Sequence, residues 1–137
     1  MVYHYWPKTQ KNMKRHVEST LQCACVKWFR LQHPRLALLL NSVPNGGARN
    51  VVTGAIMKAE GAVRGVADLE LNVARGGWFG MKIEMKTATG RQSDTQKAWQ
   101  RAVEAEGYLY VLCRGFDDFR HAVGGYLAMP PTRRESG

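Results

Sequence analysis

The stretch Asp68–Lys86, DLELNVARGGWFGMKIEMK, decides the fold. Hydrophobic and polar residues alternate near both of its ends, and side chains along a β-strand point alternately to the two faces of a sheet. The pattern predicts strands over 68–73 and 78–86, with Arg-Gly-Gly at 75–77 as a hairpin-like connection. In the second strand, one face is predicted to carry Met81, Ile83 and Met85, and the other face Lys82, Glu84 and Lys86.

This hairpin brings charged residues together. Asp68 opens the first strand, and Glu84 and Lys86 lie on the second. Two carboxylates can hold Mg²⁺, which keeps several water ligands and can also bind a substrate phosphate. The bound ion lowers the pKa of a water ligand, so that hydroxide is available near neutral pH. Lys86 can orient the attacking water or stabilise charge on phosphorus. The alternative is a solvated strand face with alternating charges, which is common for such a triplet in isolation.

On the N-terminal side of the hairpin, hydrophobic residues at helical spacing predict an amphipathic helix from about Met13 to Leu31. Glu18 lies beside its apolar stripe. The aliphatic run Ala37–Leu40 is interpreted as a buried strand, and 44–47 (Pro-Asn-Gly-Gly) as a turn. A second helix is predicted from Arg49 to Glu60, ended by Gly61.

On the C-terminal side, a helix is predicted to begin at Ser93 and to end at Gly107. It is expected to direct Trp99, Ala102 and Val103 toward the core. A strand over 108–113 and a helix over 117–127 follow, and residues 129–137 are expected to form a disordered tail. This order predicts one α/β domain over residues 1–137, with a core over about 13–128 and a mixed central sheet flanked by helices.

The charge balance favours a polyanionic partner. The chain has 20 Lys and Arg against 11 Asp and Glu, a formal charge of +9, and the first segment is the most basic. The residues expected to contact DNA are Lys11, Lys14, Arg15, Lys27, Arg30, Arg49, Lys82 and Arg91.

Several classes of protein are excluded. Three cysteines, Cys23, Cys25 and Cys113, fit neither a disulfide framework nor a zinc site, and the four histidines show no ligand-like pairing. The longest aliphatic run is far too short to span a membrane. We expect a soluble, cytoplasmic protein without a membrane partner.

The motifs together resemble the VRR-NUC family, the virus-type replication and repair nucleases of the PD-(D/E)XK superfamily. The resemblance extends from about Glu18 to Leu127. Its motifs are Glu18, Asn45-Gly46-Gly47, Gly61, Gly65-Val66-Ala67-Asp68-Leu69, Ile83-Glu84-Met85-Lys86, Gly90, Gln96, Trp99 and Gly107. The proline of the superfamily's name is Ala67 here, and a proline fixes backbone shape without contributing a ligand atom.

The resemblance implies a restriction-endonuclease-like fold and an Mg²⁺- or Mn²⁺-dependent site. Asp68, Glu84 and the main-chain carbonyl of Met85 would be metal ligands, and Lys86 the catalytic lysine. Glu18 and Gln96 would be additional active-site residues, with Glu18 reaching the metal directly or through water.

Two of these residues have structural alternatives. Gln96 also fits a capping box with Ser93, and both roles are compatible. Glu18 is alternatively a surface carboxylate on a basic helix.

The implied function is structure-selective DNA cleavage in replication, recombination or repair, in a bacterial or phage-infected cell. Stand-alone members of the family resemble Holliday junction resolvases, and two symmetric cuts imply a homodimer. Flap or nick cleavage is an alternative, and so is a basic nucleic-acid-binding module without catalysis. The sequence contains no recognisable base-reading module, so we expect recognition of shape and backbone.

Overall fold

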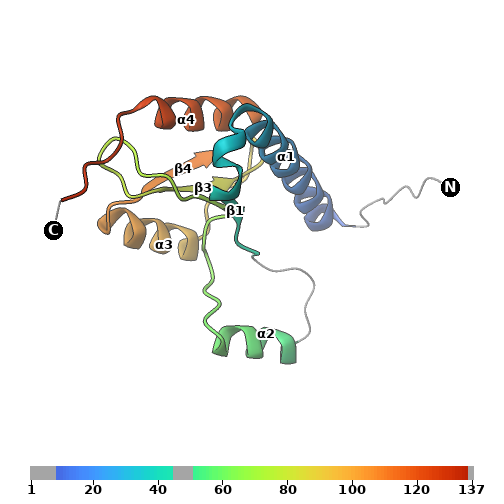
Figure 1. The fold of residues 1–137 in the computed structure, drawn as a ribbon. Helices are drawn as coiled ribbons and strands as arrows, with labels where there is room; N and C mark the ends of the chain where they lie inside the picture. The colour runs from blue at the N-terminus through green and yellow to red at the C-terminus, as the bar shows by residue number, and fades with distance from the viewer. Residues whose placement is uncertain (1–8, 45–50, 136–137) are drawn as a thin grey trace.

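The computed structural model describes residues 9–44 and 51–135 and places a mixed sheet between layers of helices (Figure 1). The helices are α1 (Gln10–Gln32), the 3₁₀ helix η1 (Pro34–Leu39), α2 (Val51–Ala59), α3 (Asp94–Ala105) and α4 (Phe116–Ala128). The strands are β1 (Leu40–Ser42), β2 (Leu69–Leu71), β3 (Met81–Met85) and β4 (Leu109–Cys113). The predicted α/β class and mixed sheet are confirmed.

The sheet has the strand order β1-β2-β3-β4. The β1–β2 and β2–β3 pairs are antiparallel, and β3–β4 is parallel. Parallel strands need a crossover, which α3 provides between β3 and β4. The hairpin predicted around 75–77 is confirmed, although its paired strands are shorter than predicted.

Helices α1 and α4 cover one face of the sheet, and α3 lies on the opposite side (Figure 1). The core between the sheet, α1 and α4 is built from apolar side chains, together with the Tyr126 ring. Its largest fully buried members are Phe29, Leu69, Leu71, Met81, Ile83, Met85, Phe119 and Val123.

The predicted alternation along β3 is confirmed on its apolar face, where Met81, Ile83 and Met85 are each at most 1% exposed. Glu84 and Lys86, expected on the opposite face, are also buried, at 2% and 9% exposure. The alternative of a solvated charged face is therefore wrong for these two residues.

The strand predicted over Ala37–Leu40 is wrong, because the chain forms η1 there and β1 begins only at Leu40. Pro34 occupies the start of η1, where its fixed φ suits a helical turn, and the amide of Leu36 donates to the carbonyl of His33 at 2.9 Å. Leu38 is 94% exposed, so this aliphatic run is not a buried strand.

Two further predictions need correction. In α3, Trp99 and Val103 are half-buried as expected, but Ala102 is exposed because it lies on the solvent side of the helix. The disordered tail was predicted to begin at residue 129. This start is too early, because the Thr132 hydroxyl donates to the carbonyl of Trp78 at 2.6 Å. Residues 130–132 therefore lie against the hairpin, where Pro131 also pairs with Arg75.

Helix α2 agrees with the predicted second helix and extends from the rest of the domain in Figure 1. Gly61 follows it with a φ of 108°, as expected for a residue that ends a helix. The predicted turn at 45–47 and residue Arg49 lie outside the described residues. Within the described ranges, no helix is long and apolar enough to cross a membrane.

Candidate active site

The predicted acidic site forms where β2 and β3 lie side by side. The backbone amide of Met85 donates to Oδ2 of Asp68 at 2.7 Å, which fixes this carboxylate beside the end of β3. Upstream, Gly65 has a φ of 88°, and a Cβ there would lie 2.4 Å from the carbonyl oxygen of Thr95. Only glycine permits this close approach between the segment before Asp68 and the first turn of α3.

Glu84 is the most deeply buried charged residue at the site, with a side chain only 3% exposed. Burial and then the nearby negative charge of Asp68 raise the pKa of Glu84 to about 8, and the positive charge of Lys86 opposes this only in part. Two acidic groups thus share a site that disfavours their joint ionisation. Such a site is electrostatically suited to a cation.

Lys86 lies on the same side of β3 as Glu84, as the alternation predicted. Its Nζ is 3.9 Å from Oε1 of Glu84, and its side chain is 11% exposed. This distance is longer than a hydrogen bond, so Glu84 does not hold the ammonium in one fixed geometry. Lys86 therefore remains able to interact with a group bound at the acidic site.

Gln96 forms the predicted capping box and also contacts Glu84. Its backbone amide donates to Oγ of Ser93 at 3.2 Å and its Oε1 accepts from the amide of Ser93 at 2.8 Å, which completes a capping box. Its Nε2 donates to Oε1 of Glu84 at 2.9 Å. The start of α3 is thereby coupled to the acidic site.

Sequence reasoning missed a tyrosine and two glutamines beside this site. The hydroxyl of Tyr110, on β4, lies 3.5 Å from Oε2 of Glu84. Nε2 of Gln92 donates to that hydroxyl at 3.1 Å and to Oε1 of Gln100 at 2.9 Å. Gln96 and Gln100 are four residues apart on α3 and share one of its faces, which was the available signal, whereas Gln92 precedes the helix.

Glu18, on α1, acts on the site through its charge, less strongly than Asp68 does. It is half-buried, and its charge is the smallest of the influences that raise the pKa of Glu84. Among the described residues, no group of three or more His, Cys, Asp or Glu side chains is arranged to hold a metal. The donors here are instead two carboxylates, from Asp68 and Glu84, which is the number that Mg²⁺ typically takes from a protein.

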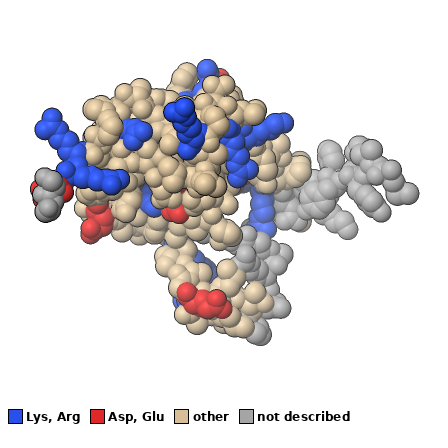
Figure 2. Space-filling view, viewed as in Figure 1, with Lys and Arg blue, Asp and Glu red and all other residues tan. Residues whose placement is uncertain are grey.

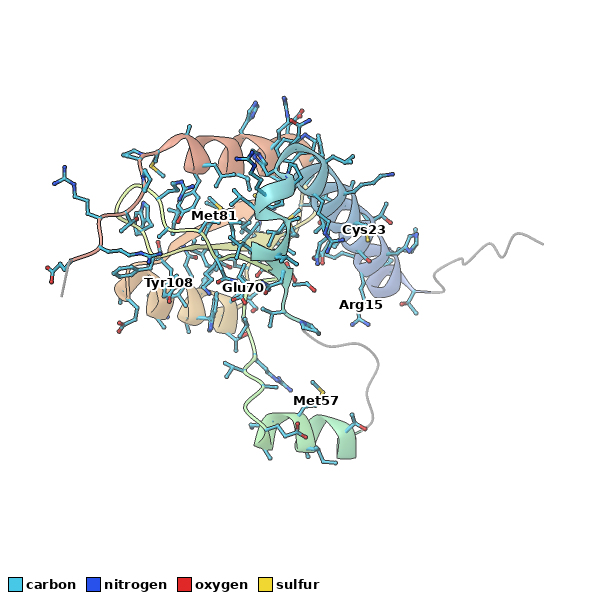
Figure 3. All side chains as sticks on the ribbon, in the orientation of Figure 1. Arg15, Cys23, Met57, Glu70, Met81 and Tyr108 are labelled. Atoms are coloured by element: carbon cyan, nitrogen blue, oxygen red, sulfur yellow. The ribbon has the colours of Figure 1, made fainter. Side chains whose placement is uncertain are left out.

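The basic residues expected at the DNA are distributed unevenly around the site. Most of the described ones are exposed, namely Lys14, Arg15, Lys27, Arg30 and Arg91. Figure 2 shows Lys and Arg side chains over the face that carries α1 and α4, and Figure 3 shows Arg15 pointing away from the body of the domain. Nζ of Lys14 would be 3.3 Å from a Cβ at Gly90, so α1 approaches the loop that follows Lys86.

Among the described residues, Lys82 is the expected DNA contact that is not exposed. Lys82 is largely buried, pairs with Glu70 at 3.1 Å and lies over the Tyr108 ring, 4.6 Å from its centroid. It is a structural cation rather than an exposed phosphate contact. The side chain of Lys11, like residue Arg49, lies outside what the structure describes.

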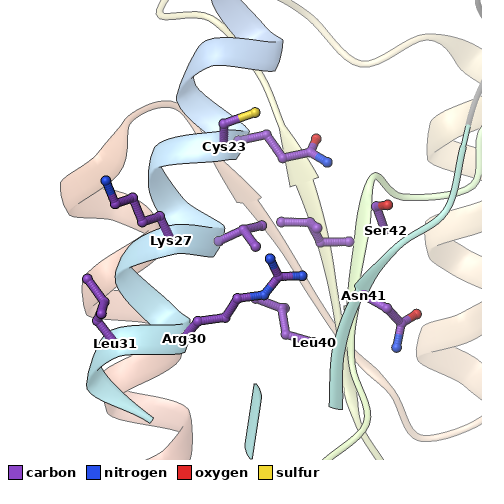
Figure 4. A pocket seen from close by; sticks show the side chains of 10 residues that line it. Cys23, Lys27, Arg30, Leu31, Leu40, Asn41 and Ser42 are labelled. Atoms are coloured by element: carbon purple, nitrogen blue, oxygen red, sulfur yellow. The ribbon is translucent and has the colours of Figure 1, made fainter. Parts of the chain in front are cut away.

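A hollow of about 390 Å³ lies between α1 and the edge strand β1 (Figure 4). Lys27 and Arg30 line it from α1, and Asn41 and Ser42 line it from β1. Its floor includes Leu69, the residue after Asp68. The hollow therefore lies on the α1 side of the sheet edge and is bordered by two basic side chains, Lys27 and Arg30.

Comparison with known proteins agrees with this arrangement. A solved structure described as a "VRR_NUC domain protein" matches with a TM-score of 0.74 and 24% identity, over 83% of this chain and 90% of that chain. This likeness supports the PD-(D/E)XK-type fold. No curated protein matches. The family model described as "VRR-NUC domain" matches residues 4–117, and the chain therefore belongs to the VRR-NUC family of nuclease-type domains.

Proposed function

We propose that this nuclease domain is a metal-dependent DNA endonuclease that hydrolyses phosphodiester bonds. The observation that carries the proposal is the burial of Glu84 beside Asp68 and Lys86, because burying charged groups is costly and needs compensation. A structural protein gains nothing from two carboxylates that repel each other in one site. A divalent cation between them would offset that repulsion.

Asp68 and Glu84 would hold Mg²⁺ or Mn²⁺, with the main-chain carbonyl of Met85 as a third donor. When bound, the cation neutralises charge on the scissile phosphate and makes hydroxide available near neutral pH. The short hydrogen bond from the backbone amide of Met85 fixes the Asp68 carboxylate. The side-chain amide of Gln96 orients the Glu84 carboxylate.

Lys86 contributes a compact positive charge on the same side of the strand. Its ammonium orients the attacking water and stabilises negative charge that develops on phosphorus. Glu18 has the smallest influence on the Glu84 pKa, and it would act on water at the edge of the site rather than as a principal ligand. These roles assign a separate task to each charged side chain.

The exposed basic residues of α1 would hold the DNA backbone. Lys14 lies beside the loop that follows the acidic site, and Lys27 and Arg30 line the hollow between α1 and β1. Contacts of this kind carry no base sequence, so we propose selection by DNA structure, such as a branch or junction. Symmetric cleavage of a junction would require a homodimer with two identical sites.

Labelled junction, flap, nicked and linear duplexes, each incubated with the protein and Mg²⁺, test the proposal. We expect cleavage of a branched substrate with Mg²⁺ or Mn²⁺, and none with Ca²⁺ or excess chelator, since calcium holds its ligands in a looser geometry. Asp68→Ala and Glu84→Ala should abolish cleavage and leave DNA binding intact. DNA binding without cleavage of any substrate would instead indicate a non-catalytic basic module.

A further inference from the structure

The Tyr110 hydroxyl lies beside the acidic site, and none of the roles described above includes it. Tyr110 is only 6% exposed, and its hydroxyl is 3.5 Å from Oε2 of Glu84. The other carboxylate oxygen, Oε1, accepts a hydrogen bond from Gln96 at 2.9 Å. The two oxygens of Glu84 are thus approached by neutral donors from two different elements, β4 and α3.

The hydrogen-bond pattern determines where the phenol proton points. Gln92 uses its amide hydrogens on the Tyr110 oxygen, at 3.1 Å, and on Oε1 of Gln100, at 2.9 Å. The phenol oxygen therefore accepts from Gln92, and its own single proton is left for Glu84. Burial, and then the nearby charge of Glu84, raise the pKa of the Tyr110 phenol above its ordinary value, so the phenol keeps this proton at neutral pH.

A carboxylate needs a restraint on each oxygen if its plane is to be fixed. The terminal torsion of a glutamate side chain is broad, so a donor at one oxygen alone leaves the group free to rotate. Groups that hydrogen-bond a metal-ligating carboxylate typically change metal affinity or activity by about 10- to 100-fold when removed.

We propose that Tyr110 is a positioning residue for Glu84, held in place by the glutamines at 92 and 100. Together with Gln96, this arrangement orients the carboxylate that binds the divalent cation. The inference rests on the proposed function, since it assigns Glu84 to the cation. It adds a residue from β4 to a site otherwise formed by the start of β2, by β3 and by helices α1 and α3.

Isothermal titration with Mn²⁺ tests this proposal without a DNA substrate. Tyr110→Phe removes only the hydroxyl, and we expect Mn²⁺ to bind about 10-fold more weakly, at the lower end of the typical range because 3.5 Å is a long contact. Tyr108→Phe is the matched control, since its ring contacts Lys82 and Phe79 instead of Glu84. The Mn²⁺ affinity of Tyr108→Phe should equal that of the parent protein.

Gln92→Leu provides an independent variant, because it leaves the tyrosine intact and removes the group that orients it. We expect a smaller loss of Mn²⁺ affinity than in Tyr110→Phe, with both titrations made at a temperature at which each variant is fully folded in chelator. Unchanged Mn²⁺ affinity in both variants would overturn the positioning role and leave the cation site standing. If the parent protein binds no Mn²⁺, the cation site itself is wrong, and this inference fails with it.

Discussion

Replacing Glu84 by glutamine should stabilise the cation-free protein at alkaline pH. Below the ordinary glutamate pKa of 4.5, the carboxyl is protonated in both the folded and the unfolded chain, and it has no effect on their difference. Between 4.5 and about 8 the unfolded chain releases the proton while the folded protein retains it, so the free energy of unfolding falls as the pH rises. Glu84→Gln removes this loss.

The magnitude follows from the pKa of about 8, which buried Glu84 has beside Asp68. Each unit of pKa difference corresponds to about 1.36 kcal/mol, so the full shift amounts to on the order of 3 to 5 kcal/mol above pH 8. For a domain of this size that corresponds to a rise in melting temperature of about 10 to 20 °C. The difference in the free energy of unfolding between parent and variant should disappear below pH 4.5, where both are uncharged at this position.

Thermal melts in excess chelator at pH 5 and pH 8 measure this effect. Glu104→Gln, on the exposed surface of α3, is the control and should leave the free energy of unfolding within about 0.5 kcal/mol of the parent at both pH values. Saturating Mg²⁺ should reverse the order, because a ligand that binds only the folded parent stabilises it by mass action. A Glu84→Gln protein that is no more stable than the parent at pH 8 in chelator would refute the reasoning.

Three further outcomes follow from the site and its surroundings. Lys86→Arg should lower the single-turnover cleavage rate by about 100-fold or more, whereas a rate within a few-fold of the parent would show that only charge balance matters there. Ser93→Ala and Gln96→Ala should each cost about 1 kcal/mol of stability in urea denaturation through the lost cap, but only Gln96→Ala should weaken Mn²⁺ binding, since it alone loses the bond to Glu84. Tyr126→Phe should lower the free energy of unfolding by about 1 to 3 kcal/mol, because the Tyr126 hydroxyl donates to a buried carbonyl at 2.6 Å, and unchanged stability would contradict that assignment.

The parts of the fold that could be predicted are those in which one periodic pattern determines one element. The alternation around Glu84 predicted both the strand and the side on which the charges lie, because a period of two has no helical equivalent. The aliphatic run from Ala37 to Leu40 was ambiguous, since short apolar runs carry no period. There Pro34 and the turn it starts determined the outcome, and Leu38 is left in solvent.

For the site, sequence patterns identified residues that carry charge and missed those that only orient them. Asp68 and Glu84 could be paired because a hairpin links their strands. Tyr110 could not be placed, since β4 joins β3 through a crossover and its register against β3 is set by tertiary packing. Lys82 was wrongly expected to contact DNA. Its partner Glu70 lies across the hairpin, and the register of the two strands, which brings the pair together, was not predictable from the sequence.

The bond between the Met85 amide and the Asp68 carboxylate ties the alignment of β2 and β3 to the site itself. A slip of one residue between these strands would turn Glu84 toward the α1 side of the sheet and move Asp68 away from that amide. A misaligned molecule would therefore lack the arrangement proposed to hold a cation. With the proposed cation site, the number of Mn²⁺ ions bound per chain would measure the fraction of a preparation that has reached the native strand pairing.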